Sequence, residues 1–196
     1  QLGGRIERHD LAVGDDRNAV AQPVGFVHIV GGQKHGGVVL AAHALDEALH
    51  ILLGTRVEAG GRLVEQQQFR IALKRGGDAA IKKWIAGQMY GRSCTVVLVG
   101  NGTANRKWIN HEIVESWNEG MGLVGIRIHG LKDSAGNIAS IGGNPFDHLT
   151  FKSGKKLSEV VKCYSPAGAT SQERYDWIKR NLSAAVEQAV AIRKAN

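Results

Sequence analysis

Residues 94–99 read Cys-Thr-Val-Val-Leu-Val, a nearly unbroken run of apolar and β-branched side chains. A strand with one face in water alternates apolar and polar residues, whereas a strand covered by helices on both faces is apolar throughout. The turn Gly100-Asn-Gly102 follows, and a helical pattern runs from Ala104 to Asn118. The stretch therefore predicts a buried strand of a parallel α/β sheet.

Three segments around this strand carry apolar residues at helical spacing. They are residues 78–90, for which Asp78 is the expected N-cap, residues 104–118 and residues 171–194. Their expected inward positions are Ile81, Trp84, Ile85 and Met89; Ile109, Ile113 and Trp117; and Tyr175, Ile178, Leu182 and Val186. Each helix is thus expected to pack one face against the sheet.

The remaining segments complete an α/β pattern. Residues 122–128 read Gly-Leu-Val-Gly-Ile-Arg-Ile and predict a second strand. Residues 130–155 are Gly-rich and predict a long loop, while residues 157–164 fit either a strand or a short helix. The order strand, helix, strand, terminal helix predicts a doubly wound parallel sheet.

The first 72 residues differ in composition from the rest. Before residue 78 lie 13 of the 26 glycines and five of the eight histidines, while every Trp and Tyr follows residue 80. We therefore divide the chain into an atypical Gly/His-rich segment, 1–72, and an α/β domain, 73–196. One hypothesis is that part of the first segment is a frame-shifted or wrong-strand translation; the other is that it is sequence foreign to the domain's family.

The atypical segment has only weakly patterned elements. These are an apolar run at 24–30, a helical stretch at 38–53 and a hairpin-like stretch at 55–66. His28, His35, His43 and His50 recur in it, but only the last two could share a helix face. Without a motif such as HExxH to support them, we expect no metal site.

Composition restricts the cellular location, the state of the cysteines and the kinds of ligand that we expect. No stretch approaches the ~18 to 20 apolar residues of a membrane-spanning helix, and no secretory signal opens the chain, so we expect a cytoplasmic protein. Two cysteines, Cys94 and Cys163, are too few for a disulfide framework and are expected to be reduced. Residues 78–196 hold 16 Lys/Arg and 10 Asp/Glu, an excess that allows nucleic-acid binding without indicating it.

Ligands of doubly wound sheets bind beyond the carboxyl ends of the strands, where the loop of residues 100–107 is expected to lie. Gly100 and Gly102 resemble the start of the dinucleotide fingerprint GxGxxG, but the third position is Asn105. No acidic residue follows the next strand, where His129 and Gly130 stand. A Rossmann dehydrogenase is therefore disfavoured.

The helix after this loop places a carboxylate beside an aromatic ring. Trp108 and Glu112 are one turn apart and share a face. Read from the residues alone, Glu112 fits either a solvated helix face shared with Glu115 and Glu119 or a functional site near the strand ends.

Three runs of sequence resemble the TIR-like family of the Thoeris anti-phage system: KRGGDAAIKKWI at 74–85, GRSCTVVLVG at 91–100 and TANRKWINHEI at 103–113. Residues 122–133, 144–146 and 175–179 continue the resemblance, which covers about 73–193. It implies a flavodoxin-like (TIR-like) fold and cleavage of NAD⁺ to a cyclic ADP-ribose-type signal for a separate effector protein. NAD⁺ would be the substrate, with no other cofactor and no metal, and family members often self-associate.

The resemblance also implies roles for individual residues. Glu112 would be the catalytic carboxylate and Trp108 a pocket-edge residue. The loop residues Asn101, Gly102 and Thr103 would contact the substrate, and Lys107 and Arg106 would hold its pyrophosphate at the helix start. A carboxylate near the ribose suits this reaction, because breaking the nicotinamide–ribose bond builds positive charge on the sugar.

The chain departs from the family at its amino-terminal end. Family members open with a strand reading roughly Phe-Ile-Ser-Phe and a loop that forms the other wall of the pocket, and residues 1–72 hold no counterpart. Residues 24–30 are the candidate to replace that central strand. An incomplete pocket favours the alternative of a non-catalytic interaction module.

Overall fold

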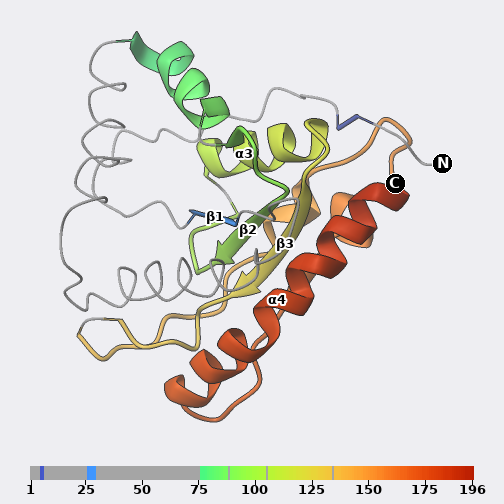
Figure 1. The fold of residues 1–196 in the computed structure, drawn as a ribbon. Helices are drawn as coiled ribbons and strands as arrows, with labels where there is room; N and C mark the ends of the chain where they lie inside the picture. The colour runs from blue at the N-terminus through green and yellow to red at the C-terminus, as the bar shows by residue number, and fades with distance from the viewer. Residues whose placement is uncertain (1–4, 7–25, 30–75, 88, 105, 134) are drawn as a thin grey trace.

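The computed structural model describes residues 5–6, 26–29, 76–87, 89–104, 106–133 and 135–196, with backbone only at 26–29. A four-stranded sheet in the order β1-β2-β3-β4 forms the centre of this part of the chain (Figure 1). The strands are β1 Phe26–Ile29, β2 Cys94–Val99, β3 Gly122–Arg127 and β4 Lys162–Tyr164. The last three are parallel, as the sequence predicts.

The strand β2 has the bounds expected from its apolar run, and all six of its residues are buried. Its parallel pairing with β3 runs from Cys94 opposite Gly122 to Val99 opposite Arg127. Both strands therefore end at the same edge of the sheet, where the α/β fold places ligand sites.

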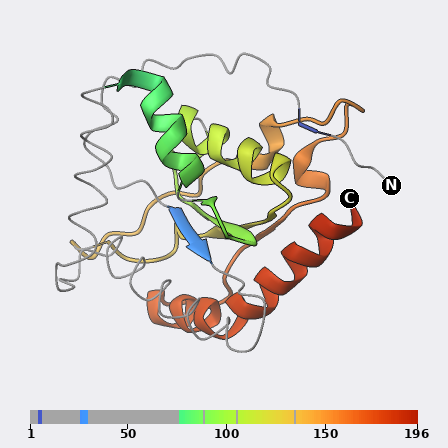
Figure 2. The ribbon, with the colours of Figure 1, turned by 45° about the horizontal axis from the view of Figure 1, so that its top comes forward.

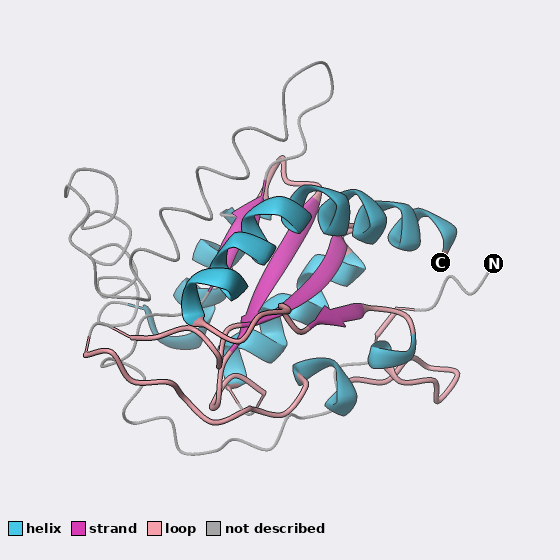
Figure 3. Cartoon of the chain, turned by 90° about the horizontal axis from the view of Figure 1, so that it is seen from below, coloured by secondary structure: helices cyan, strands magenta, loops and turns pink. Residues whose placement is uncertain are grey.

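Helices cover both faces of the sheet (Figure 3). On one face, α3, Lys107–Asn118, packs Ile109, Ile113 and Trp117 against the sheet. On the other face, α4, Ser171–Ala195, packs Ile178 and Leu182. The doubly wound architecture is confirmed, because alternate side chains of β2 enter opposite cores.

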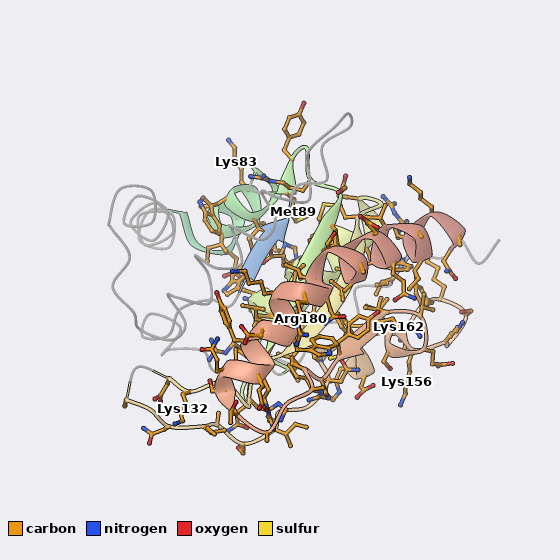
Figure 4. The ribbon with its side chains drawn as sticks, turned by 60° about the horizontal axis from the view of Figure 1, so that its bottom comes forward. Lys83, Met89, Lys132, Lys156, Lys162 and Arg180 are labelled. Carbon is orange, nitrogen blue, oxygen red and sulfur yellow. The ribbon has the colours of Figure 1, made fainter. Side chains whose placement is uncertain are left out.

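A further helix over residues 76–87 lies beside α3. Its Ile81 and Ile85 are buried with Met89 and Met121, and the rings of Trp84 and Trp108 pack against this cluster. Figure 4 shows Met89 at the sheet end of the helix. The expectation that Asp78 is an N-cap was wrong: the helix already includes residue 76, and the carboxylate of Asp78 instead pairs with the Lys107 ammonium of α3.

The long loop contributes more to the core than its Gly content suggests. It contains a short 3₁₀ helix, Pro145–His148, and it buries Phe146, Leu149 and Phe151 on the α3 side of the sheet. Residues 157–164 combine both expected forms, since a 3₁₀ turn at Leu157–Glu159 leads into β4.

The described parts of the amino-terminal segment join the same sheet and core. The strand β1 pairs with β2 in antiparallel orientation, with Phe26 opposite Val97 (Figure 2). The candidate central strand at 24–30 therefore runs antiparallel to β2, and among the described strands it lies at the end of the sheet order. Ile6 is buried, and its N–H donates to Asn118 Oδ1 at 3.2 Å.

The other elements and side chains predicted for this segment lie outside the described residues. They are the stretches 38–53 and 55–66, and the histidines His35, His43 and His50, together with the side chain of His28. Among the helices that the structure does describe, none has the length and apolar character needed to span a bilayer.

Candidate active site

The loop between β2 and α3 is shaped by one hydroxyl. Thr103 Oγ1 accepts a hydrogen bond from the Gly100 N–H at 2.9 Å and donates to the Leu98 carbonyl at 3.3 Å. The Thr103 side chain is buried, whereas Asn101 and Gly102 are exposed at the tip. Of the three expected substrate-contacting loop residues, Thr103 therefore braces the loop and the other two face outward.

A second loop lies against the first. A Cβ on Gly142 would fall 2.1 Å from the Gly100 carbonyl oxygen and 2.8 Å from that of Asn101, so only glycine fits there. Arg127, the last residue of β3, donates from Nη1 to the Gly142 carbonyl at 2.7 Å. The loops that follow β2 and β3 thus form one continuous rim at the carboxyl edge of the sheet.

No role was predicted from the sequence for Arg127 or Gly142. Arg127 could have been predicted as a site residue, because a charged residue at the end of a predicted buried strand lies where ligands bind. No local pattern identifies Gly142, since its close approach to residue 100 depends on the folding of a long loop.

The first turn of α3 is tied to the neighbouring helix. Lys107 pairs with Asp78, and its ammonium lies 4.9 Å from the centre of the Trp108 ring. The Trp108 ring in turn meets His111 edge-on, with ring centres 5.9 Å apart. Lys107 is therefore engaged, and it would exchange Asp78 for a phosphate only if the ligand bound more strongly.

Glu112 lies in the second turn of α3 and is 3% exposed. Its side chain does not project into bulk water, which removes the solvated-face interpretation. One turn further on the same face, Ser116 Oγ lies 2.8 Å from Thr95 Oγ1 of β2 and 4.0 Å from Met89 Sδ. The face that carries Trp108 and Glu112 is thus turned toward the helix of residues 76–87. A glutamate this deeply buried is unusual and calls for a structural or functional reason.

The start of α3 offers backbone donors. Arg106 occupies the N-cap position in extended conformation and makes no side-chain capping bond, and the first turn of α3 contains no acidic residue. The positive end of the helix dipole is therefore not offset by a carboxylate of that turn. Across the parts of the chain that the structure describes, no group of three or more His, Cys, Asp or Glu side chains is arranged to hold a metal ion.

The part of the chain that forms this site is similar in sequence to known proteins. Residues 50–133 match the family model described as Thoeris protein ThsB, TIR-like domain. Over 87 residues the chain is 42% identical to a Bacillus cereus (strain MSX-D12) protein named "Putative cyclic ADP-D-ribose synthase ThsB1". That alignment covers 43% of this chain and 45% of the relative, so the chain spans about half the length of the curated relative it matches. The family match includes β2, α3 and β3, and it begins before residue 73, whereas residues 1–49 lie outside it.

Proposed function

Because residues 50–133 carry the sequence of a ThsB TIR-like domain, we propose that this chain cleaves NAD⁺ and closes the ADP-ribosyl group into a cyclic product. The bond between nicotinamide and ribose C1′ breaks and nicotinamide leaves as a neutral molecule. An internal nucleophile of the same molecule attacks C1′, and one proton is released. The name of the relative from B. cereus supports this reaction class.

The observation that carries the proposal is the burial of Glu112 on the helix that follows the central parallel strand. A carboxylate in a site that excludes water stabilises developing positive charge far better than one in bulk solvent. The charge on the ribose at bond cleavage is of this kind. Glu112 would therefore contact the ribose, with the Trp108 ring at the edge of the same site.

The other residues predicted to contact the substrate have different roles in this proposal. Asn101 and Gly102 are the exposed tip of the rim, and the uncapped first turn of α3 presents N–H groups for the pyrophosphate. Thr103 would act indirectly by holding the loop. Since Glu112 is only 3% exposed, we infer that the side chains covering it move apart when the nucleotide binds.

The test is to incubate the purified chain with NAD⁺ and to follow nicotinamide and the cyclic product by chromatography. Glu112→Gln keeps the size of the side chain but removes the charge, and we expect turnover to fall by about a hundredfold or more. Glu119→Gln, at the exposed end of the same helix, is the matched control and should retain activity. Equal turnover in Glu112→Gln and the unmodified chain would remove Glu112 from this role.

The product is proposed to act on a separate effector protein in anti-phage defence. Addition of the reaction mixture, freed of the enzyme by filtration, to a candidate effector separates signalling by a small molecule from signalling by contact. Self-association is part of the same proposal, and it predicts that specific activity rises with protein concentration.

A non-catalytic interaction module is the second candidate. The antiparallel edge strand β1 favours it, because the family resemblance implies a central strand and an adjoining loop at the amino-terminal end. Under this alternative, the chain shows no turnover of NAD⁺ at any protein concentration while it still binds a protein partner.

A further inference from the structure

We propose that Arg127, His129 and Arg174 form a binding site for a phosphate group at the carboxyl end of β3. These residues are distinct from Glu112 and from the first turn of α3, so the inference goes beyond the proposed function. Arg127 ends β3, His129 stands two residues later, and Arg174 comes from the first turns of α4.

Arg174 is brought to this place by the absence of a side chain at Gly130. A Cβ on Gly130 would lie 1.6 Å from Arg174 Nη1, so the guanidinium rests directly on that glycine, next to His129. Arg174 Nε donates to the Gly168 carbonyl at 2.9 Å, which fixes the side chain. Gly130 is buried and Arg174 is half-buried, so the guanidinium lies against the sheet edge.

Arg127 stands at the end of β3, two residues before His129. Its hydrogen bond to the Gly142 carbonyl holds it under the rim formed by the two loops. Burial is the largest cause that lowers the pKa of His129, and the positive charges of Arg174 and Arg127 lower it further. Arg127 and His129 stand two residues apart at the end of β3 and the Arg174 guanidinium lies against Gly130, so three nitrogen-bearing side chains come together at the edge where doubly wound sheets bind ligands.

The two guanidiniums of this cluster are held by carbonyl oxygens, not by carboxylates, within the described residues. Within the described ranges, neither arginine has an acidic group at ion-pair distance, and each is held by a carbonyl oxygen. Two nearby acids accept hydrogen bonds elsewhere: Asp133 Oδ1 accepts the N–H groups of residues 135 and 137, and Glu173 accepts those of residues 169 and 170. Each guanidinium keeps donors beyond the one used, and a phosphate can accept from both.

His129 adds a third, independent observation. Its Nδ1 atom is enclosed and has no hydrogen-bond partner within the part of the chain that the structure describes. An enclosed ring nitrogen without a partner is costly, and an acceptor oxygen placed at this point would satisfy it in the tautomer that carries the proton on Nδ1. The occupant that fits two guanidiniums and an imidazole is a phosphate, either free or as part of a nucleotide.

The experiment measures binding without any turnover. ADP, inorganic phosphate and adenosine are titrated by calorimetry into the full chain and into Arg127→Gln and Arg174→Gln. Arg180→Gln is the matched control, because Arg180 lies exposed on α4 (Figure 4) and its Nε also donates to a backbone carbonyl, that of Asp176. Unfolding curves of each variant establish that it is folded.

We expect each of the two test variants to weaken phosphate-dependent binding by about tenfold or more, as loss of a charged hydrogen bond predicts, and Arg180→Gln to leave it unchanged. Binding of ADP but not of inorganic phosphate assigns the site to a nucleotide, and binding of both at the same arginines assigns it to the phosphate group itself. Adenosine that binds as tightly as ADP overturns the proposal, as does a wild-type chain that binds neither phosphate probe.

A second measurement does not depend on the variants. In the unmodified chain, the imidazole resonances of His129 should shift on addition of the phosphate probe that binds, and unchanged resonances at saturation would contradict the assignment. Because ADP lacks the nicotinamide–ribose bond, these results stand apart from any failure of NAD⁺ cleavage at Glu112.

Discussion

The hydroxyl oxygens of Thr95 and Ser116 lie 2.8 Å apart, and both side chains are completely buried. Thr95 belongs to β2 and Ser116 to α3, so this hydrogen bond joins the sheet to the helix that carries Glu112 one turn earlier. Apolar contacts tolerate small rotations of a helix, whereas a hydrogen bond depends on angle and distance. The pair therefore fixes the orientation of the face on which Glu112 lies.

This pair can be tested by a double-mutant cycle. Thr95→Val or Ser116→Ala alone leaves one buried hydroxyl without its partner, and we expect each to lower the free energy of unfolding by about 1–3 kcal/mol. The double variant should cost less than the sum of the two, because it leaves no orphaned group. Denaturant unfolding of the four proteins measures the coupling, and strictly additive costs would show that the hydrogen bond does not stabilise the fold.

Gly122 is expected to be intolerant of any side chain. A Cβ there would lie 2.7 Å from the Val190 nitrogen and 2.8 Å from the Ala189 carbonyl carbon, which are backbone atoms of α4. Backbone of a long helix cannot yield as a flexible side chain does, so Gly122→Ala should push α4 from the sheet at a cost of about 1–3 kcal/mol.

Thermal unfolding checks this cost. Gly136→Ala serves as a contrast: nothing lies near its Cβ position, and only the strain of its positive φ of 84° applies. If Gly122→Ala is no less stable than the unmodified chain, α4 does not pack on β3 as closely as the structure has it.

Cys94 is expected to resist thiol reagents in the folded protein. Burial raises the pKa of its thiol to about 12, from an ordinary value of 9.0. The thiolate is the reactive form, so at pH 8 almost none is present and the side chain is also out of reach. A disulfide-exchange reagent should modify Cys94 only as fast as the chain unfolds, and rapid labelling in native buffer would contradict the buried position in β2.

Features of the fold that arise from a segment's own residues could be predicted from the sequence, whereas features that arise from contacts between segments could not. The bounds of β2 follow from its own apolar run, and the inward positions Ile109, Ile113 and Trp117 follow from their spacing. The start of α3 was placed three residues early, because Thr103 bonds to Gly100 and Leu98 and holds residues 100–104 in a turn. Helical propensity cannot reveal such competition.

The candidate site was predictable only in part. Spacing placed Trp108 and Glu112 on one face, but it could not show that this face is covered, since the cover includes a helix about 30 residues earlier in the chain. Arg127 and Arg174 lie near His129 although they are 47 residues apart in the chain, and the position of Arg174 depends on the absent side chain of Gly130. Convergence of this kind comes from the tertiary fold and leaves no local pattern.

The start of α4 yields a prediction on pH. Thr170 and Glu173 form a capping box: Thr170 Oγ1 accepts the Glu173 N–H, while the Glu173 carboxylate accepts the N–H groups of Thr170 and Ala169. These bonds, first those from the Thr170 and Ala169 backbone, lower the pKa of Glu173 below its ordinary 4.5. A lowered folded-state pKa means that the ionised carboxylate stabilises the native chain above pH 4.5, and that this contribution is lost as the pH falls toward the lowered value.

Glu173→Gln should therefore be less stable than the unmodified chain at pH 7, and the difference should narrow as the pH falls below about 4.5 and protonation removes the charge in both proteins. Thr170→Ala removes the other half of the box and should cost about 1 kcal/mol at neutral pH. Because the Thr170 hydroxyl does not titrate, most of that cost should persist in acid. Unfolding curves at pH 7, 5 and 3.5 separate the two effects, and a Glu173→Gln difference that stays constant across this range would exclude the carboxylate as the source of the cap's stability.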